Sequence, residues 1–242
     1  MPEAKPGADN SKLAIVGYGK MGRMIEQFAP EYGFEVAAQV DLGERPSLHG
    51  MDVAVEFTTP SAVVSNVEWL ASAGIPVVVG TTGWSGDLER VKAIVAQHGT
   101  GLVWSPNFSV GVNIFFRIVE TAATLMKDEG EYGAWAWEMH HATKKDAPSG
   151  TLLKLVDEMR SAGFARAISV SSNRAGQVPG THEIGFDSAA DMITLRHTAR
   201  NREGFARGAL RAAQWIRGRK GFYEFTDLLF GGQPCSPAAV QR

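Results

Sequence analysis

Short apolar runs alternate with amphipathic stretches in the N-terminal part of the chain. The runs are rich in Val, Ile and Ala, and their length and β-branched residues are typical of parallel strands that are buried on both faces. Between them, apolar residues recur at helical spacing, as Met21, Met24, Ile25 and Phe28 do. The predicted strands are 12–16, 34–41, 52–57, 76–79 and 101–104. Strands that alternate with helices in this way predict a doubly wound, Rossmann-like parallel sheet of the α/β class.

The pattern changes after this region. A long helix with a broad apolar face is predicted at 110–126, and strands separated by Gly, Pro and Asn are predicted within 132–141 and 166–200. These features indicate a second domain, of the α+β class. Its strands alternate too weakly to close a sandwich within one chain, so we expect the sheet to pack against copies of itself. The expected parts are a frayed N-terminus at 1–11, a dinucleotide-binding domain at 12–107, a substrate-binding and oligomerisation domain at 108–211, and a C-terminal segment at 212–242 that returns to the first domain.

A glycine-rich turn follows the first predicted strand. It reads Gly17-Tyr18-Gly19-Lys20-Met21-Gly22 and leads into a predicted helix, and Asp41 ends the next strand about twenty residues later. The glycine spacing alone is weak evidence in a chain with 27 glycines, but this order of elements is typical of dinucleotide binding. Gly17 is expected to form the tight turn, Gly19 to admit the pyrophosphate, and Gly22 to let the helix pack on the strand. The turn as a whole, with Lys20 and Met21, is therefore a predicted cofactor contact.

Asp41 bears on the choice between NADH and NADPH. A carboxylate at this position would accept hydrogen bonds from the adenosine ribose and would repel a 2′-phosphate. The nearest arginine is Arg45, and a nearby arginine can override the effect of the acidic residue. We therefore expect NADH to be preferred, with NADPH as the alternative cofactor.

Small polar residues end three of the predicted strands, at 58–59, 80–83 and 105–109. The C-terminal ends of parallel strands form one edge of the sheet, across which a dinucleotide lies. Ordinary turn residues are the alternative interpretation, but the repetition at one edge favours cofactor contacts, with the nicotinamide near Thr82 and Phe108. The predicted contacts are Phe57, Thr58, Gly80, Thr82, Ser105, Asn107, Phe108 and, in a predicted helix at 205–217, Arg211.

The segment 138–151 combines proton donors with an anion-binding helix start. It reads Glu138-Met139-His140-His141-Ala142-Thr143-Lys144-Lys145-Asp146-Ala147-Pro148-Ser149-Gly150-Thr151. Ser149 is a good N-cap, and the N–H groups of the first turn would bind a carboxylate or phosphate. Histidine is the usual general acid near neutral pH. An ordinary capped helix is the alternative, but the groups together fit a dianionic substrate that must be protonated.

A metal site is a weaker interpretation of the same histidines. No His-x-x-x-His or Glu-x-x-His pair would share a helix face, and Cys235 is the single cysteine of the sequence. We therefore expect no metal ion at this segment.

Composition narrows the class further. A net charge of −2 argues against bulk nucleic-acid binding, and no apolar run reaches the roughly 18 residues of a membrane span. The single cysteine suits a reducing cytosol, so we expect a cytoplasmic protein with a small-molecule substrate and neither a nucleic-acid nor a membrane partner.

Taken together, these residues resemble the 4-hydroxy-tetrahydrodipicolinate reductase family of lysine and diaminopimelate biosynthesis. The resemblance covers nearly the whole chain from Gly17 onward. It rests on a specific signature: a Glu, a His two residues later, and then Lys-x-Asp-x-Pro-Ser-Gly-Thr, which here begins at Glu138. Gly80-Thr81-Thr82-Gly83 and the segment 107–113 match two further family motifs. The resemblance implies an NAD(P)H-dependent oxidoreductase that forms a homotetramer through the sheet of its second domain.

The resemblance also implies a role for each signature residue. His140 would be the proton donor, and Lys144 would assist as an acid or orient the substrate. The two carboxylates of the cyclic substrate would be bound by His141, Lys144, Ser149, Gly150 and Thr151. The implied reaction is hydride transfer to the substrate ring, with protonation and loss of water.

Three features depart from the family pattern: the strand start at 135–137, Leu152, and the segment 178–200, which is shorter than in the best-known members. Two rival functions are to be weighed as well. Trp135-Ala136-Trp137 replaces an acidic-aliphatic start of the signature strand, and Leu152 replaces an alanine. One rival is another two-domain NAD(P)-dependent reductase of the aspartate or homoserine dehydrogenase type, which predicts no carboxylate site at 149–151. The other is a non-catalytic nucleotide sensor, which would have no use for His140 together with Lys144.

Overall fold

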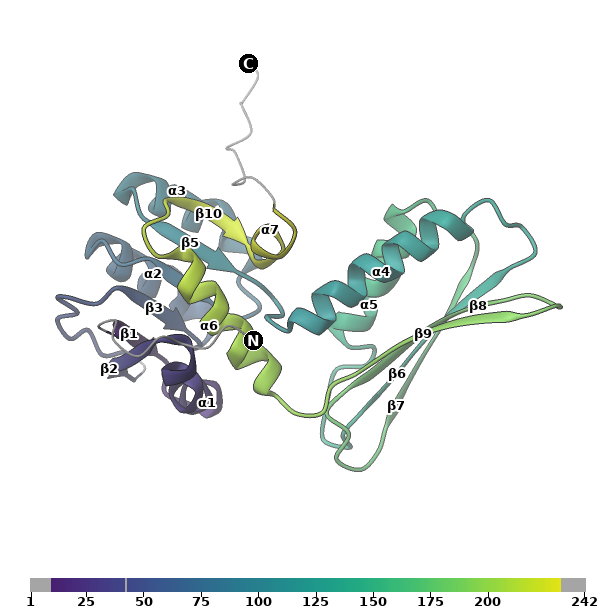
Figure 1. Ribbon diagram of the computed structural model, residues 1–242, viewed down its shortest axis with the longest axis horizontal. Coiled ribbons are helices and arrows are strands. Elements are labelled where there is room, and N and C mark those ends of the chain that lie inside the picture. The colour runs from purple at the N-terminus through teal and green to yellow at the C-terminus, as the bar shows by residue number, and fades with distance from the viewer. Residues whose placement is uncertain (1–9, 42, 232–242) are drawn as a thin grey trace, which may run out of the picture. The chain divides into compact units, whose positions relative to one another are not determined.

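The computed structural model describes residues 10–41 and 43–231 of the chain. Residues 1–9 of the N-terminus expected to be frayed, and the part of the C-terminal segment from 232 onward, lie outside the described residues. The chain forms two compact units, which Figure 1 shows with their elements labelled. The first unit takes the chain up to Ser109 and again from Phe205, and the second unit is Val110–Gly204.

A six-stranded parallel sheet forms the centre of the first unit, in the order β10-β5-β4-β3-β1-β2. The chain adds β2 on one side of β1 and then crosses to place β3, β4 and β5 on the other side, which is the doubly wound topology. The strands that the apolar runs predict are β1 (Ser11–Val16), β2 (Phe34–Val40), β3 (Val53–Glu56), β4 (Val77–Val79) and β5 (Gly101–Trp104).

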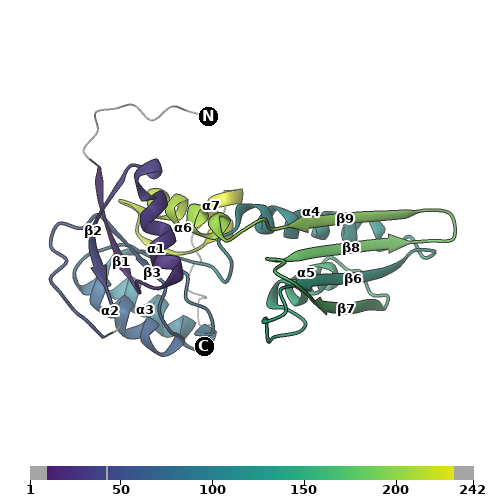
Figure 2. The ribbon, with the colours of Figure 1, turned by 90° about the horizontal axis from the view of Figure 1, so that it is seen from below.

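Helices cover both faces of this sheet. Figure 2 shows α2 and α3 on one face and α1 and α6 on the other. Apolar side chains of α2 and α3 pack with those of β1, β3 and β4 in one buried core. Burial on both faces is the reason that the strands read as continuous apolar runs. The helices and 3₁₀ turns are α1 (Lys20–Phe28), η1 (Ala29–Tyr32), η2 (Pro60–Ala62), α2 (Val63–Ser72), η3 (Ser85–Asp87), α3 (Leu88–His98) and α6 (Glu203–Ile216).

The C-terminal part of the first unit contains one strand that the sequence pattern did not indicate. β10 (Gly221–Glu224) pairs in parallel with β5, and α7 (Phe225–Phe230) follows it. Phe225, one of the apolar residues expected to return to the first domain, is fully buried there. The apolar content predicted the return of the chain but not the strand, because the run is only four residues long.

The boundary after the second unit lies earlier than the expected residue 211. The second unit ends at Gly204, and α6 from Phe205 onward belongs to the first unit. The physical reason is a close approach of the helix to the backbone: a Cβ at Gly208 would lie 1.8 Å from the carbonyl oxygen of Phe108. Arg211 is therefore a residue of the first unit.

A four-stranded mixed sheet in the order β7-β6-β8-β9 forms the second unit with two helices. β6 pairs with β7 in parallel, and the other two pairs are antiparallel. The helices α4 and α5 cover one face of the sheet, and Leu152, at the position of the family alanine, is fully buried in that core. The elements are α4 (Val110–Met126), β6 (Gly133–His140), α5 (Gly150–Ser161), β7 (Ile168–Arg174), β8 (Thr181–Asp187) and β9 (Met192–Thr198).

The other face of this sheet carries the two unusual tryptophans. Trp135 lies over Gly185 of the neighbouring strand, where a Cβ would meet the indole ring at 2.1 Å. Because side chains alternate along a strand, Trp135 and Trp137 point away from the face that carries Glu138 and His140. The departure from the family pattern therefore alters the outer face of the sheet and leaves the helix-covered face unchanged.

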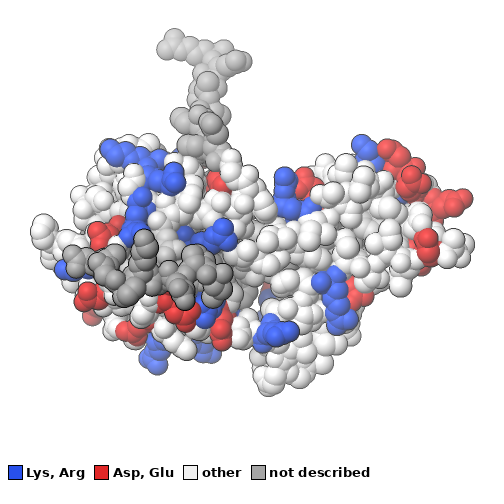
Figure 3. Space-filling view, viewed as in Figure 1, with Lys and Arg blue, Asp and Glu red and all other residues white. Residues whose placement is uncertain are grey.

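The surface offers a mixed distribution of charge. On the face drawn in Figure 3, acidic and basic side chains are interspersed, in agreement with the net charge of −2. Across residues 10–41 and 43–231, no helix combines the length and the apolar character that crossing a membrane requires.

Candidate active site

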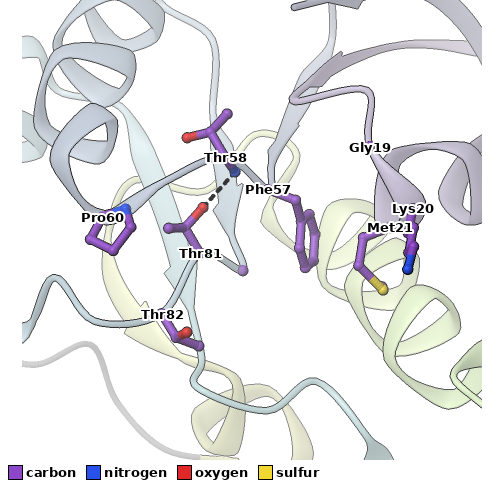
Figure 4. A pocket seen from close by; sticks show the side chains of 9 residues that line it. Gly19, Lys20, Met21, Phe57, Thr58, Pro60, Thr81 and Thr82 are labelled. Atoms are coloured by element: carbon purple, nitrogen blue, oxygen red, sulfur yellow. Dashed lines mark hydrogen bonds between the residues drawn. The ribbon is translucent and has the colours of Figure 1, made fainter. Parts of the chain in front are cut away.

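A pocket at the C-terminal edge of the parallel sheet brings together seven of the predicted cofactor contacts. It has a volume of about 500 Å³, within the usual range for small-molecule sites. The turn between β1 and α1 forms one side, and the ends of β3 and β4 form the other, as Figure 4 shows. The lining residues are Gly19, Lys20, Met21, Phe57, Thr58, Pro60, Gly80, Thr81 and Thr82.

The glycines of the turn fit the backbone of this pocket closely. Gly17 has a φ of +94°, and a Cβ there would lie 2.1 Å from the carbonyl oxygen of Phe57. A Cβ at Gly22 would lie 2.5 Å from the carbonyl oxygen of Gly17, so the start of α1 packs directly on the turn. Gly19, in contrast, faces open space and precedes a helix start that has no side-chain cap. The first N–H groups of α1 are therefore available to a pyrophosphate, and the turn fits a dinucleotide.

The wall of the pocket is held by threonines at the ends of two neighbouring strands. The backbone N–H of Thr58 donates to the hydroxyl of Thr81 at 2.7 Å, and Figure 4 shows this bond. Thr81 is mostly buried and was not among the predicted contacts. Only its place in Gly80-Thr81-Thr82-Gly83 could have indicated Thr81 as a pocket residue. The alternation of side chains along a strand does not continue into a turn, so it cannot tell which threonine faces the pocket.

Besides Gly17 and Gly22, five other predicted cofactor contacts do not line this pocket. Asp41 and Arg211 are exposed, at the end of β2 and on α6. Ser105 is engaged with Asn107, since its hydroxyl donates to the carbonyl oxygen of Asn107 at 2.8 Å. Phe108 is buried between Phe57 and Phe225, with ring centroids 6.4 and 5.0 Å away. Phe108 therefore supports the pocket from behind Phe57.

A buried carboxylate is the centre of a second cluster, which lies in the second unit. Glu138 on β6 is fully buried, and its Oε1 accepts from the backbone N–H of Ser149 at 2.9 Å. The Ser149 hydroxyl donates to its Oε2, and Arg174 at the end of β7 donates to its Oε1 at 2.8 Å. His182 is the register partner of Glu138 on β8, and its Nε2 lies 3.5 Å from Oε2. One carboxylate thus connects three strands and the start of α5.

His140 lies beside this carboxylate on the same face of β6. Its Nδ1 is 3.6 Å from Oε2 of Glu138, and its ring meets that of His182 edge to face, with centroids 5.1 Å apart. The other nitrogen, Nε2, is close to Gly180, where a Cβ would lie 3.0 Å from it. Nδ1 has no hydrogen-bond partner among the described residues, so the Glu138 carboxylate acts on the His140 ring through its charge and leaves Nε2 for proton transfer.

The protonation states of the cluster follow from burial and from hydrogen bonds. Burial opposes ionisation of Glu138, but the hydrogen bonds from Ser149 and Arg174 outweigh it and hold the pKa of Glu138 below its ordinary value. Burial lowers the pKa of His140, although the charge of Glu138 works in the opposite direction. Burial and the neighbouring His140 lower the pKa of His182 to about 4, so His182 is neutral at pH 7. The protein by itself therefore favours neutral His140, and charging it requires an additional anion.

Lys144 and His141 lie on the turn that follows β6. The Lys144 ammonium is 2.6 Å from the carboxylate of Asp146, and this contact lowers the pKa of Asp146. The Nδ1 of His141 lies 2.8 Å from the hydroxyl of Thr143. Both side chains are partly exposed, so the turn presents cationic and hydrogen-bonding groups at the surface close to His140 in the chain.

Ser149 has a structural role at the start of α5. Ser149 caps α5 as predicted, because its hydroxyl oxygen accepts from the N–H of Leu152 at 3.2 Å. Both of its donors, however, are directed at Glu138, and the side chain is 3% exposed. Ser149 therefore positions Glu138, and its contact with a substrate carboxylate stays a prediction, as do those of Gly150 and Thr151.

The same three buried side chains could hold a metal ion. Glu138, His140 and His182 each place a possible ligand atom within 4.8 Å of the others. The carboxylate is already bonded to Ser149 and to the guanidinium of Arg174, which would repel a cation. The donor set therefore suits a histidine beside a carboxylate better than a metal centre.

Arg174 and His182 are the site residues that sequence reasoning missed. They lie 36 and 44 residues after Glu138, and they reach it only because β7 and β8 flank β6 in this register. A lone histidine or arginine in a strand gives no signal by itself, and strand register is not readable from this sequence.

A dinucleotide pocket on a doubly wound sheet, together with a histidine beside a buried carboxylate in an α+β unit, defines a two-domain NAD(P)-dependent oxidoreductase. Within that class, the chain belongs to the dihydrodipicolinate reductase family. The family models described as dihydrodipicolinate reductase, N-terminus, and dihydrodipicolinate reductase, C-terminus, match residues 11–108 and 111–229.

Relatives support the assignment over 90% of the chain. The chain is 32% identical to the 4-hydroxy-tetrahydrodipicolinate reductase of Christiangramia forsetii, over 90% of this chain and 97% of the relative. It is 35% identical to the enzyme of the same name from Archaeoglobus fulgidus, over 90% and 99%. Among solved structures, the dipicolinate-bound dihydrodipicolinate reductase of Paenisporosarcina sp. TG-14 has the same fold, with a TM-score of 0.76 at 22% identity, over 90% of this chain and 99% of that one.

Proposed function

We propose that this chain reduces 4-hydroxy-tetrahydrodipicolinate to tetrahydrodipicolinate in lysine and diaminopimelate biosynthesis. The observation that carries the proposal is the Glu138–His140 pair next to the exposed start of α5, in a chain that also has a dinucleotide pocket. Its relatives bear the name of this reductase, and a protein of the same fold binds dipicolinate, a cyclic dicarboxylate. The aspartate or homoserine dehydrogenase interpretation does not survive the family assignment.

The residues of the second unit supply binding and protonation in this reaction. The nicotinamide cofactor supplies a hydride when bound, and the balance is substrate, NAD(P)H and one proton converted to product, NAD(P)⁺ and water. The N–H groups of Gly150 and Thr151 bind one substrate carboxylate at the positive end of α5. The ammonium group of Lys144 leaves its ion pair with Asp146 and binds a substrate carboxylate instead. The bound dianion raises the pKa of His140, which then gives its proton from Nε2 to the reduced substrate, with the charge of Glu138 beside Nδ1.

The loop after β2 supports a preference for NADH. Asp41 lies at the end of β2, and Glu44 is held close to it, because the N–H of Asp41 donates to the Glu44 carboxylate at 3.1 Å. The guanidinium of Arg45 is engaged within the protein: it donates to the carbonyl oxygen of Glu44 and to the side-chain oxygen of Asn66, each at 2.7 Å, and lies 4.9 Å over the ring of Trp69. The carboxylates of Asp41 and Glu44 together would repel a 2′-phosphate.

Replacing Asp41 with alanine is expected to raise the ratio of kcat/KM with NADPH to kcat/KM with NADH by roughly tenfold, the factor that about 1.4 kcal/mol represents. The change removes both the ribose contact that favours NADH and a charge that repels the 2′-phosphate. Steady-state kinetics with both cofactors measure the ratio, and Glu35→Ala, an exposed change on the same strand, is the control. A wild-type protein that already prefers NADPH strongly would contradict this assignment of Asp41.

We propose further that the chain is a homotetramer assembled through the outer face of the second sheet. This face is not covered by α4 or α5, and it carries Trp135, Trp137 and the exposed Met192. Sedimentation equilibrium should give four times the 26.1 kDa of one chain. Trp137→Glu should give species smaller than the tetramer. The control Thr124→Glu, at an exposed position of α4, should leave the tetramer intact. A monomeric wild-type protein would refute the assembly.

One assay tests the proposed function. NADH oxidation is followed after 4-hydroxy-tetrahydrodipicolinate is generated in the cuvette by a coupled synthase, because the substrate is unstable. Turnover that depends on the synthase supports the proposal. Dinucleotide binding without turnover would instead indicate a nucleotide-sensing protein.

A further inference from the structure

Arg174 joins the buried carboxylate of Glu138 to the turn that carries Lys144. It is the last residue of β7 and the register partner of His140, so it lies at the end of the sheet where the proton donor lies. One nitrogen of its guanidinium, Nη2, donates both to Oε1 of Glu138, at 2.8 Å, and to the backbone carbonyl oxygen of Asp146. The proposed mechanism gives the second of these contacts no role.

The turn after β6 is attached to the end of β7 and the chain beyond it at two points. At the start of the turn, the N–H of Ala142 donates to the carbonyl oxygen of Gly176 at 3.2 Å. Near its end, the carbonyl oxygen of Asp146 accepts from the guanidinium of Arg174. Lys144 lies between the two attachments, so the backbone from which its side chain extends is held on both sides.

The guanidinium of Arg174 is a firm attachment point for this turn. Its side chain is 16% exposed and pairs with the fully buried carboxylate of Glu138, in a site where charges attract more strongly than in water. Nη1 donates to the carbonyl oxygen of Asn173 at 2.8 Å. Nε is buried and has no hydrogen-bond partner among the described residues, so the orientation of the group satisfies Nη1 and Nη2 and leaves one donor unpaired.

Asp146 connects Arg174 to Lys144. Its backbone carbonyl oxygen accepts from Arg174, and its side-chain oxygens accept from the Lys144 ammonium at 2.6 and 2.7 Å. A substrate carboxylate can take the place of the Asp146 side chain with little movement of Lys144 as long as the turn is fixed. A loose turn would have to be ordered on binding, and that ordering costs conformational entropy.

We propose that Arg174 is a positioning residue, which fixes the turn so that Lys144 can bind a substrate carboxylate. The inference rests on the proposed function, because it needs a dicarboxylate at Lys144. Arg174 does not contact the substrate in this role: Glu138 balances its charge, so the pair exerts little attraction on an anion. The alternatives are a direct contact of Arg174 with a substrate carboxylate and a role in the stability of the unit alone.

A double-mutant cycle separates positioning from both alternatives. Dipicolinate, a cyclic dicarboxylate, is titrated by calorimetry at saturating NADH into wild type, Arg174→Met, Lys144→Met and the double variant, up to concentrations that saturate Lys144→Met. We expect Arg174→Met to raise the Kd of dipicolinate about tenfold when Lys144 is present, and less than about twofold in the Lys144→Met background. Equal effects in the two backgrounds would overturn the inference, because a direct contact or a general defect does not depend on Lys144.

The matched control is Arg160→Met. Arg160 is an exposed residue in the last turn of α5, and its guanidinium also donates to backbone carbonyl oxygens, those of Ala165 at 3.1 Å and Arg166 at 3.2 Å. This variant should bind dipicolinate as wild type does. A loss in Arg160→Met equal to that in Arg174→Met would overturn the inference, because it would show that loosening any such contact in this unit weakens binding.

A second variant keeps the inference testable if Arg174→Met does not fold, because that change leaves Glu138 buried without its cation. Arg174→Lys keeps the positive charge, but its ammonium ends one bond short of Nη2 and does not reproduce the planar fork. It should raise the Kd of dipicolinate about threefold, again only when Lys144 is present, and wild-type affinity would overturn the inference. A wild-type protein that neither binds dipicolinate nor turns over in the coupled assay would refute the proposed function itself, whereas an active wild type with equal effects in both backgrounds would refute the role of Arg174 alone.

Discussion

Replacing His140 with glutamine is expected to lower kcat by roughly 10² to 10⁴, the usual contribution of a general acid. Glutamine keeps a polar side chain of similar size beside Glu138 but cannot deliver a proton. The neighbouring carboxylate makes His140 the best-placed donor, since it lies 3.6 Å behind Nδ1 and leaves Nε2 for the substrate. KM should change little, because the groups proposed to bind the substrate carboxylates, at Gly150, Thr151 and Lys144, remain.

The control for this variant is His98→Gln, which removes a histidine that pairs with Glu68 at 2.8 Å on the surface of the first unit. It should leave kcat unchanged. Near-normal turnover of His140→Gln would show that Lys144 is the proton donor. In that case the activity of the variant should fall at alkaline pH, as a lysine loses its proton, and not near neutrality.

The dinucleotide-binding unit could be predicted from sequence because its signals are local. A strand buried on both faces is a continuous apolar run, and the turn from Gly17 to Gly22 has a sequence that its backbone requires. Gly17 illustrates the point, since a side chain there would overlap the backbone of Phe57. Thr81 and Phe108 show the limit of the same reasoning, because the sequence places them at the strand ends but does not tell which of them faces the pocket and which faces the core.

The centre of the second site could be predicted only in part. The signature segment contains Glu138, His140 and Ser149, and the cap at Ser149 followed from helix chemistry. The direction of the Ser149 hydroxyl, and the approach of Arg174 and His182, depend on strand order and register. Strand order and register are properties of the whole sheet. The sequence therefore shows Glu138 as one residue of a signature, and only the folded unit shows it as the centre of a hydrogen-bond network.

Replacing Glu138 with glutamine is expected to have the second-largest effect, on both stability and pH dependence. The change leaves Arg174 without the carboxylate it contacts at 2.8 Å, in a site where the Glu138 side chain is fully buried. Removing one partner of a buried ion pair costs on the order of 3 kcal/mol, so urea unfolding of the variant should have a clearly lower midpoint. The control Glu183→Gln, on β8, breaks the more exposed pair with Arg196 and should cost under about 1 kcal/mol.

The pH–rate profile of Glu138→Gln carries the mechanistic part of the prediction. The charge of Glu138 raises the pKa of His140 against the opposing effect of burial. Without that charge the pKa of His140 falls further, and the acid form that gives the proton is lost at a lower pH. The alkaline limb of kcat/KM should therefore move toward acid pH, while Glu138→Asp, which keeps the charge, should move it less. A profile that stays in place, in a variant that is destabilised but folded, would mean that Glu138 holds the sheet and α5 together without acting on the proton of His140.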